Sequence, residues 1–370
     1  MLPGSLAASM SLTTDARGFR ELLSDPAAAE SVSAAAGCPL VVVEVADGSG
    51  GAGLAGLDMT ALPVVVLGVV RDSGCLPPAA YAACDVLLTE DDAADRPFTA
   101  PPGGLQAGLD TLIAAISANP VAAATLALLL RSTAGLSVPA ALVAESAAYS
   151  ALQDGAEFRR WRAGRPPQPP EAGIERIRLE RSGTDLRIAL ARPARRNAVD
   201  WRMRDALAGA LADAVREPCL RVELAGDGPD FCSGGDLDEF GSRPDPACAH
   251  IVRLARSPAL LLHRIADRTT ARLHGSCLGA GIELPAFADR IVAADDTRIA
   301  LPELGLGLIP GAGGTVSLTR RIGRWRTAFL ALSGTCLTAA DALGWGLVDA
   351  VEPSGSVEPS GSVERPDAGP

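Results

Sequence analysis

Residues 274–314 constrain this chain more than any other part, because they combine apolar runs with glycines and two glutamates in a fixed order. The small residues 279–281 let the backbone turn tightly and let a ligand approach its amide groups. The apolar residues 282–288 predict a helix, whose first turn presents unpaired N–H groups and the positive end of a dipole. Glu283 lies in that turn and Glu303 follows later, so we expect two carboxyl groups beside one set of backbone donors. Such a site can stabilise an anion and move protons.

The glycines of this stretch do not fit either of two common nucleotide-binding motifs. Position 284 is leucine where the dinucleotide motif needs its third glycine, and no Lys-Ser or Lys-Thr pair ends a phosphate-binding loop. The two glutamates also have structural readings. Glu283 can cap a helix start, and Glu303 can be a solvated acid in a glycine-rich turn. Both readings stay open for each glutamate taken alone.

A series of motifs in the second half of the chain is more specific than any one of them. In order they are Arg192-Pro-Ala-Arg-Arg-Asn197-Ala198, Phe231-Cys-Ser-Gly-Gly235-Asp-Leu237, Leu278-Gly-Ala-Gly-Ile-Glu283-Leu, Asp289, Pro302-Glu303 and Pro310-Gly-Ala-Gly-Gly-Thr315. Their order and spacing resemble those of the enoyl-CoA hydratase/isomerase (crotonase) family. The resemblance covers residues 172–352, about half of the chain, and implies the crotonase-like α/β fold, a spiral of ββα units.

The resemblance also implies a chemistry. Adding water to a 2-enoyl thioester, or moving its double bond, develops negative charge on the thioester oxygen, which two backbone N–H groups can stabilise. By the resemblance, Gly235 and Ala280 supply these amides as an oxyanion hole. Glu283 and Glu303 would hold a water, one taking its proton and the other protonating the α-carbon. The coenzyme A thioester is the substrate, and no separate cofactor is expected.

The presence of both acids favours hydration of a 2-enoyl-CoA. Three alternatives remain: an enoyl-CoA isomerase, other crotonase-type acyl-CoA chemistry, and a non-catalytic acyl-CoA-binding scaffold. The acyl group cannot be read from the sequence, because in this family it depends on the segment that corresponds to residues 240–267.

Further residues match the substrate-binding segments of the family. These predicted contacts are Arg195, Asn197, Ala198, Asp236, Leu237 and Gly279. One departure is Asp238, which stands where many relatives carry a basic residue for the CoA phosphates. Arg195, Arg196 and Arg324 are the candidate substitutes.

Segments of the first half of the chain resemble segments of the second half in sequence. Residues 83–92 resemble 288–296, and the run 62–70 resembles the strand expected before His274. Apolar runs at 40–45, 64–70 and 86–88 predict strands buried on both faces, and helical blocks follow at 105–117, 120–131 and 138–154. We interpret residues 1–165 as a shortened, degenerate crotonase-like half ending in helices. The alternative is ordinary strand and turn sequence in an alanine-rich chain.

The first half lacks the acids of the second. Aligned on Asp85 of the first half and Asp289 of the second, Ala79 takes the place of Glu283, and Thr99 takes that of Glu303.

The expected organisation has four parts. They are a degenerate domain with its helical segment (1–165), a proline-rich linker (166–171), a catalytic domain (172–350) and a disordered tail with a repeated Val-Glu-Pro-Ser-Gly-Ser (351–370). In this family, helices after the position of residue 351 cover the active site and build the trimer, and residues 105–162 resemble those helices. We therefore expect residues 105–162 to pack against the catalytic half, from the same chain or a neighbouring subunit, in a homo-oligomer (trimer or hexamer).

Composition narrows the class of partner. The net charge of −11 disfavours nucleic acid, and all 33 basic residues are arginines, which excludes lysine Schiff-base chemistry. The eight cysteines show no metal-ligand spacing, and no serine-hydrolase elbow occurs. Cys232 and Cys277 flank the predicted oxyanion hole, and small buried thiols are the simpler reading of both. Without a signal peptide or an apolar run long enough to span a bilayer, we expect a cytoplasmic protein with no membrane partner and no metal.

Overall fold

The computed structural model describes residues 11–45, 49–71, 76–92, 94–165, 175–242 and 245–354. The helices are α1 (Ala16–Leu23), α2 (Ala28–Ser31), α3 (Leu105–Ala118), α4 (Pro120–Ser132), α5 (Val138–Gln153), α6 (Ala156–Ala163), α7 (Trp201–Arg216), α8 (Pro246–Ala255), α9 (Pro258–Arg264), α10 (Ala280–Glu283), α11 (Gly314–Ser333) and α12 (Ala339–Trp345). The strands are β1 (Leu12–Asp15), β2 (Leu40–Val45), β3 (Val65–Val70), β4 (Val86–Leu88), β5 (Ile177–Ser182), β6 (Asp185–Leu190), β7 (Arg221–Gly226), β8 (Thr269–Leu273), β9 (Ser276–Leu278), β10 (Arg290–Ala294), β11 (Arg298–Ala300), β12 (Leu337–Thr338) and β13 (Ala350–Glu352). The mixture is α/β, as expected.

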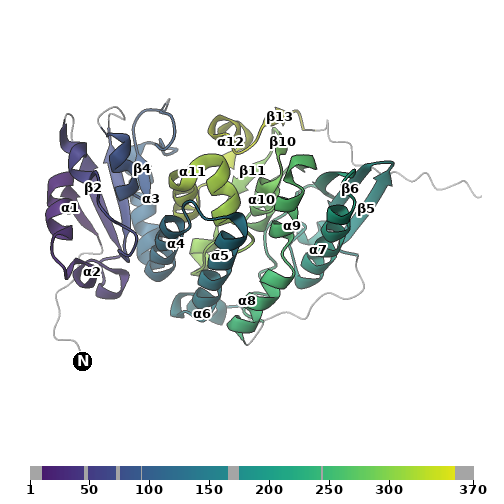
Figure 1. Ribbon diagram of the computed structural model, residues 1–370, viewed down its shortest axis with the longest axis horizontal. Coiled ribbons are helices and arrows are strands. Elements are labelled where there is room, and N and C mark those ends of the chain that lie inside the picture. The colour runs from purple at the N-terminus through teal and green to yellow at the C-terminus, as the bar shows by residue number, and fades with distance from the viewer. Residues whose placement is uncertain are drawn as a thin grey trace, which may run out of the picture.

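The N-terminal part forms a separate parallel sheet in the order β1-β2-β3-β4, at one end of the molecule in Figure 1. Alternate residues of β2 enter different cores. Leu40 and Val42 pack toward α3–α5, whereas Val41 and Val43 pack toward α1. The sheet is therefore buried on both faces, as its unbroken apolar runs predict.

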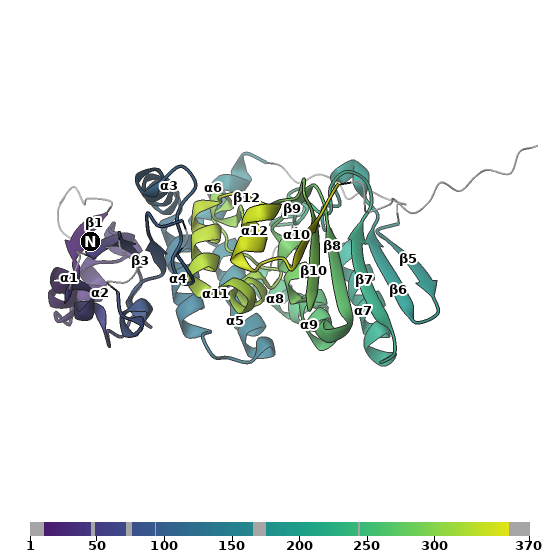
Figure 2. The same cartoon turned by 90° about the horizontal axis from the view of Figure 1, so that it is seen from above.

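The second half contains a larger sheet in the order β13-β10-β8-β7-β6-β5, in which only the β5–β6 hairpin is antiparallel. A small sheet, β12-β11-β9, lies beside it and leads into α10. Figure 2 shows the larger sheet from above, with α7 on one of its faces. The strands deliver two loops to one place, because residues 231–235 follow β7 and residues 279–283 follow β9.

Helices α3–α6 lie between the two sheets and pack against the second half of the same chain. Contacts join α3 and α4 to α11, and α5 to α8, α9 and α11. One continuous apolar core includes Leu67 of the N-terminal sheet, Leu126 of α4 and Leu224 of β7. The expectation that residues 105–162 cover the second half is confirmed, and the covering helices come from the same chain.

Two details differ from the sequence-based expectations. The helix expected over 282–288 ends at Glu283, because Pro285 has no N–H to continue it and a 3₁₀ turn follows. Residues 350–352 form β13 on the edge of the larger sheet, so the first residues of the expected disordered tail are ordered. The proline-rich linker and the repeat after residue 354 lie outside the described residues.

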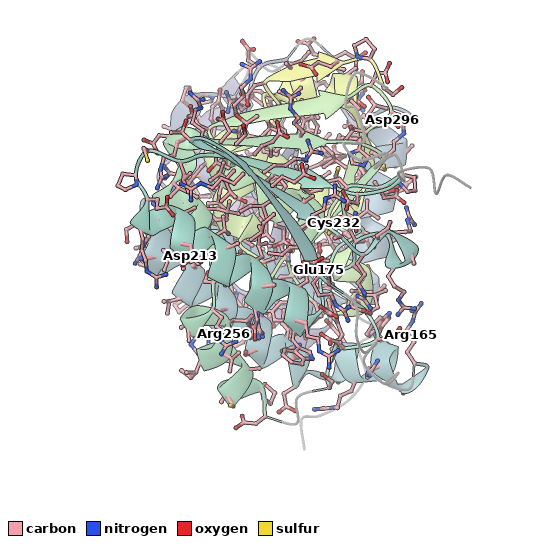
Figure 3. All side chains as sticks on the ribbon, turned by 90° about the vertical axis from the view of Figure 1, so that its right-hand side faces the viewer. Arg165, Glu175, Asp213, Cys232, Arg256 and Asp296 are labelled. Atoms are coloured by element: carbon pink, nitrogen blue, oxygen red, sulfur yellow. The ribbon has the colours of Figure 1, made fainter. Side chains whose placement is uncertain are left out.

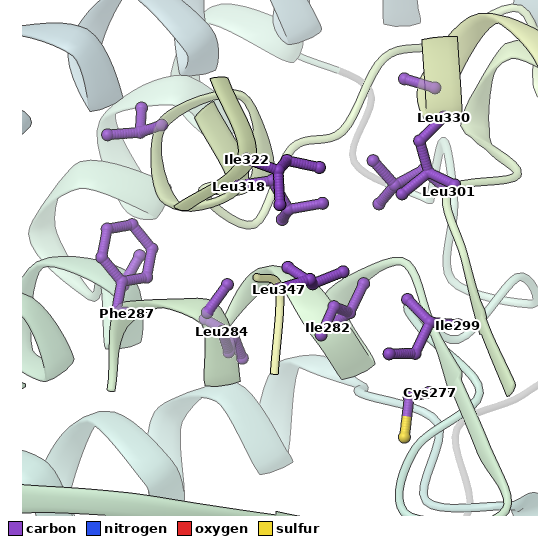
Figure 4. Close-up of a cluster of buried hydrophobic side chains, with 14 of the residues drawn as sticks. Cys277, Ile282, Leu284, Phe287, Ile299, Leu301, Leu318, Ile322, Leu330 and Leu347 are labelled. Atoms are coloured by element: carbon purple, nitrogen blue, oxygen red, sulfur yellow. The ribbon is translucent and has the colours of Figure 1, made fainter. Parts of the chain in front are cut away.

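The core beneath the short helix α10 holds it against α11. Figure 4 shows Ile282 and Leu284 facing Leu318 and Ile322 of α11 across a layer of buried apolar side chains. The helix α11 itself is broken at Gly323 (φ 79°, ψ 159°). Among the described residues no single helix is long and apolar enough to cross a membrane, and α3 with α4 meets that criterion only as a pair bent by 108°.

Candidate active site

Two loops lie side by side and present free backbone amides. Residue 232 bridges to 277 as in a parallel sheet, and the Leu278 amide donates to the Cys232 carbonyl at 3.0 Å. The backbone turns at Gly279 (φ 49°, ψ −120°), a conformation that favours glycine. Within the described part of the chain, neither the amide of Gly235 nor that of Ala280 donates a hydrogen bond. Both residues line the same cavity, so the structure brings the two predicted oxyanion donors together.

The helix α10 is a single turn, so its dipole contributes less than the sequence suggested. The position of the Gly235 loop depends instead on packing from α6. A methyl group on Gly235 would lie 2.6 Å from the ring of Phe240, and that ring lies 6.3 Å from the ring of Trp161 in α6. The first half of the chain therefore supports one of the two amides.

The carboxyl groups of Glu283 and Glu303 lie on the same side of Gly279. A methyl group on Gly279 would lie 2.3 Å from Glu303 Oε1 and 3.8 Å from Glu283 Oε1. Glu283 is 2% exposed and Glu303 is 8% exposed. Glu303 Oε2 is buried with no hydrogen-bond partner among the described residues. The two predicted acids therefore share one buried site, in which one carboxyl oxygen has no hydrogen-bond partner among the described residues.

A third carboxyl group, that of Glu145 in α5, joins them. The first amides of α11 and its preceding turn alternate between two acids. Ala312 and Gly314 donate to Glu283 Oε2 at 2.7 and 2.9 Å. Gly313 and Thr315 donate to Glu145 Oε1 and Oε2 at 2.7 and 2.9 Å, and the Thr315 hydroxyl donates to Glu145 at 2.6 Å. A helix N-terminus thus holds two carboxylates, one from each half of the chain.

No ion pair between described residues includes any of the three acids, although the charges of Glu145 and Arg253 act on each other from beyond ion-pair distance. Burial raises the pKa of Glu283 to about 7, against backbone donors that lower it. Burial, followed by the charge of Glu283, raises the pKa of Glu145 to about 8 and that of Glu303 well above its ordinary value. Carboxyl groups that titrate near neutral pH can exchange protons with a substrate at physiological pH.

The acids open into a cavity of about 290 Å³. Its lining includes the two amides, the three glutamates, apolar side chains such as Leu142 and Val252, and Tyr149. The helix α8, from the segment expected to vary with substrate, forms one wall and has no fully buried residue.

Some predicted substrate contacts have side chains occupied within the protein. Asn197 is fully buried, its Oδ1 accepting from the Arg192 amide at 2.8 Å and its Nδ2 donating to the carbonyls of Asp227 and Asp230 at 2.8 and 2.9 Å. Asp236 accepts from the Arg192 side chain at 2.6 Å. The side chains of Asn197 and Asp236 are therefore already occupied, and a substrate contact at these positions involves backbone atoms.

The remaining predicted contacts lie near the surface of this loop. Ala198 is buried, Leu237 is partly exposed, and the exposed Arg195 forms an ion pair with Asp238. Asp238 thus takes up the charge of an arginine that was a candidate for the CoA phosphates. Arg196 is similarly held by Asp230, at 2.9 and 3.2 Å.

The structure places Arg324 away from this site. Its Nη2 donates to the Ala82 carbonyl at 3.1 Å, and its Nη1 lies 3.7 Å from Asp85 in the N-terminal part. The prediction that Arg324 substitutes for a phosphate-binding residue is therefore wrong. Cys232 and Cys277 are fully buried, and burial raises the pKa of both thiols, to about 12 for Cys232, which favours the reading of small buried thiols. No cluster of three or more metal-ligating side chains occurs in the described part of the chain.

The sequence analysis assigned no role to Glu145 or to Arg253, which also lines the cavity. A signal for Glu145 exists, because it is the only charged residue in the otherwise apolar and small-residue sequence of α5. No comparable signal marks Arg253, which lies on a surface helix.

The sequence profile of the enoyl-CoA hydratase/isomerase family matches residues 180–361. The mevalonyl-coenzyme A hydratase SIDH of Beauveria bassiana is 35% identical over 179 residues, which are 46% of this chain and 64% of that protein. The cyclohexa-1,5-dienecarbonyl-CoA hydratase of Thauera aromatica is 33% identical over 180 residues, 48% of this chain and 67% of that protein. The chain thus spans about two thirds of the length of these relatives. The enoyl-CoA hydratase structure from Thermoplasma volcanium is 36% identical, covering 48% of this chain and 71% of that one with a TM-score of 0.44.

Proposed function

This chain belongs to the enoyl-CoA hydratase/isomerase family, with a crotonase-like α/β fold in its second half, and we propose that it hydrates a 2-enoyl-CoA thioester. One observation carries the proposal. Glu283 and Glu303 both flank Gly279, beside the free amides of Gly235 and Ala280. A single acid can shift a double bond, whereas two acids on one water can deliver hydroxyl and proton together.

In the proposed reaction the thioester oxygen accepts hydrogen bonds from Gly235 and Ala280. The hydrogen bonds from both amides become shorter and stronger as negative charge develops on that oxygen. Each such donor typically lowers the barrier by about 3–4 kcal/mol.

The water lies between the two acids. Glu283, whose anion is held by two amides, takes a proton from the water as its oxygen bonds to the β-carbon. Glu303, whose pKa is raised further by the charge of Glu283, carries the proton that the α-carbon receives. Glu283 ends protonated and Glu303 ionised, and exchange with solvent restores the starting state.

The test uses the full chain with 2-enoyl-CoA thioesters of increasing length, starting from crotonyl-CoA. Loss of the conjugated thioester absorbance reports hydration, deuterium at the α-carbon reports the proton transfer, and a parallel titration measures binding. We expect hydration with one solvent deuterium at the α-carbon. Binding without turnover at every chain length would support the scaffold, and double-bond migration without addition of water would support an isomerase. A cytoplasmic location stays a prediction from the composition of the chain, and assembly as a homo-oligomer stays a prediction from the resemblance.

A further inference from the structure

Three arginines line the cavity, and one of them differs from the others in its partners. Arg204 forms an ion pair with Asp205 at 2.7 Å, and Arg256, labelled in Figure 3, pairs with the same aspartate. No ion pair between described residues includes Arg253. The cavity therefore contains one arginine with no carboxylate at ion-pair distance among the described side chains, and the charge of Glu145 acts on it only from farther away.

Neutral groups of α5 surround Arg253. Its Nε donates to Ser146 Oγ at 3.1 Å, and its Nη2 donates to the Ser146 carbonyl at 3.2 Å and to Ser150 Oγ. Its guanidinium lies 4.8 Å from the centre of the Tyr149 ring. These contacts fix the orientation of the guanidinium but do not neutralise it, and burial lowers its pKa.

One corner of the guanidinium keeps donor capacity. A guanidinium has five N–H groups, and the contacts of Nε and Nη2 use three of them. Nη1 makes a single long contact, 3.5 Å to Gln153 Oε1. Nη1 is therefore the corner at which an incoming acceptor can bind without displacing a short hydrogen bond.

The position of Arg253 relates it to the catalytic loop. A methyl group on Gly311 would lie 2.4 Å from Tyr149 Cδ2, so the Tyr149 ring contacts both this glycine and Arg253. Gly311 precedes Ala312, whose amide holds Glu283. The unpaired cation thus lies one aromatic ring beyond the loop that positions the proposed base.

We propose that Arg253 binds a carboxylate at the far end of the acyl chain, so that the preferred substrate is the mono-CoA thioester of an unsaturated dicarboxylic acid. This substrate class rests on the proposed hydration. A planar guanidinium with a fixed orientation suits a carboxylate, and a methyl-ended chain leaves it unpaired in a partly dry cavity. A site built to bind a polar group discriminates strongly against an analogue that lacks it.

The test compares glutaconyl-CoA, which carries a distal carboxylate, with crotonyl-CoA. We expect a higher kcat/KM for glutaconyl-CoA and a fall in this preference of about 10-fold to 100-fold in Arg253→Met. Arg253→Lys should keep part of the preference. Arg256→Met, which removes the same charge from the residue directly after α8, should leave the ratio of the two substrates unchanged. No residue of α8 is fully buried, so these substitutions spare the core.

A binding experiment separates this inference from the proposed reaction. Calorimetry with the saturated thioesters glutaryl-CoA and butyryl-CoA needs no turnover, and we expect glutaryl-CoA to bind more tightly to the wild type but not to Arg253→Met. That result would support the arginine site even if no enoyl-CoA is hydrated. Equal binding of the two thioesters, or an equal loss of both in Arg253→Met, would overturn it and leave Arg253 as a counter-charge for the glutamates.

Discussion

The two halves of the molecule bury acids in opposite ways. In the N-terminal part, Asp85 is 1% exposed and accepts from Arg131 Nε and from the Val66 amide, each at 2.8 Å. Arg324 Nη1 lies 3.7 Å from Asp85 Oδ1. In the second half, Glu283 and Glu303 are about as deeply buried, yet no ion pair between described residues includes either of them.

This difference separates structure from function. A buried carboxylate with a guanidinium partner has its hydrogen bonds satisfied and joins two parts of the fold. A group of buried carboxyls without a cation destabilises the folded state and shifts its proton affinity toward neutral pH. Buried carboxyl groups without a cation therefore mark the proposed site of proton transfer.

The largest effect is expected for Glu303→Gln. Turnover on a competent enoyl-CoA should fall by about 10²–10⁴-fold, because the acid that protonates the α-carbon is removed. The unfolding free energy should stay unchanged or rise, because an unpartnered buried carboxyl becomes a neutral amide of the same size. Rates of thioester loss and urea denaturation of the same samples check both parts. A fall in stability that matches the loss of activity would contradict the functional reading.

Asp85→Asn should have the opposite profile. Removing one partner of a buried pair leaves Arg131 uncompensated, so the unfolding free energy should fall by about 3–5 kcal/mol. The remaining folded protein should keep its turnover per molecule. Asp185→Asn is the matched control, because Asp185 pairs with Arg221 in the same bidentate way at the surface, and it should be almost neutral. Equal denaturation midpoints for the two variants would remove the basis of the comparison.

Glu145→Gln should shift the pH profile of turnover. The charge of Glu145 raises the pKa of Glu303, the proposed proton donor, so its removal should lower that pKa and move the alkaline limb of kcat/KM to lower pH. Glu157 is a matched control, since it accepts from the Val121 and Ala122 amides at 2.8 and 2.9 Å at the start of α4. Glu157→Gln should leave the alkaline limb in place, and an unmoved limb in Glu145→Gln would show that Glu145 only packs the helices.

The smallest effect concerns stability against pH. The pKa values of Glu145 and Glu283 rise from 4.5 to about 8 and about 7 on folding, mainly through burial. Between pH 4.5 and these raised pKa values, the folded state holds more protons than the unfolded chain. The unfolding free energy therefore falls as pH rises through this window. In Glu145→Gln the unfolding free energy should decrease less over the same pH window. Urea denaturation at the two ends of the window measures it, and an identical fall in both proteins would exclude the raised pKa of Glu145.

Much of the fold follows from local patterns. The β-branched runs predict β2 and β4 with the bounds that the structure has. Apolar residues at every fourth position, namely Met203, Leu207, Leu211 and Val215, predict a helix from about Asp200 to Arg216, which is α7. The strand β1 was missed because Leu-Thr-Thr-Asp has a single apolar residue and becomes a strand only through pairing with β2. Tertiary pairing decides such short edge strands.

The residues of the site also divide into those that local patterns predict and those that depend on tertiary contacts. Glu283, Glu303, Gly235 and Ala280 lie in short motifs, so the sequence predicts them together. Glu145 does not, because its partner amides lie 168 and 170 residues away along the chain. Contacts of that separation depend on how the first half folds over the second, which no local pattern encodes.

The most direct test of the central claim, that Glu283 and Glu303 act together on one water, is a double-mutant cycle on enoyl-CoA hydration. Initial rates of thioester loss are measured for the wild type, Glu283→Gln, Glu303→Gln and the double variant, with butyryl-CoA binding as a check that the site remains formed. Because the two acids act as a unit, the double variant should lose far less than the product of the two single losses. Full activity of Glu303→Gln beside an inactive Glu283→Gln would contradict the claim and make a one-base isomerase the better account.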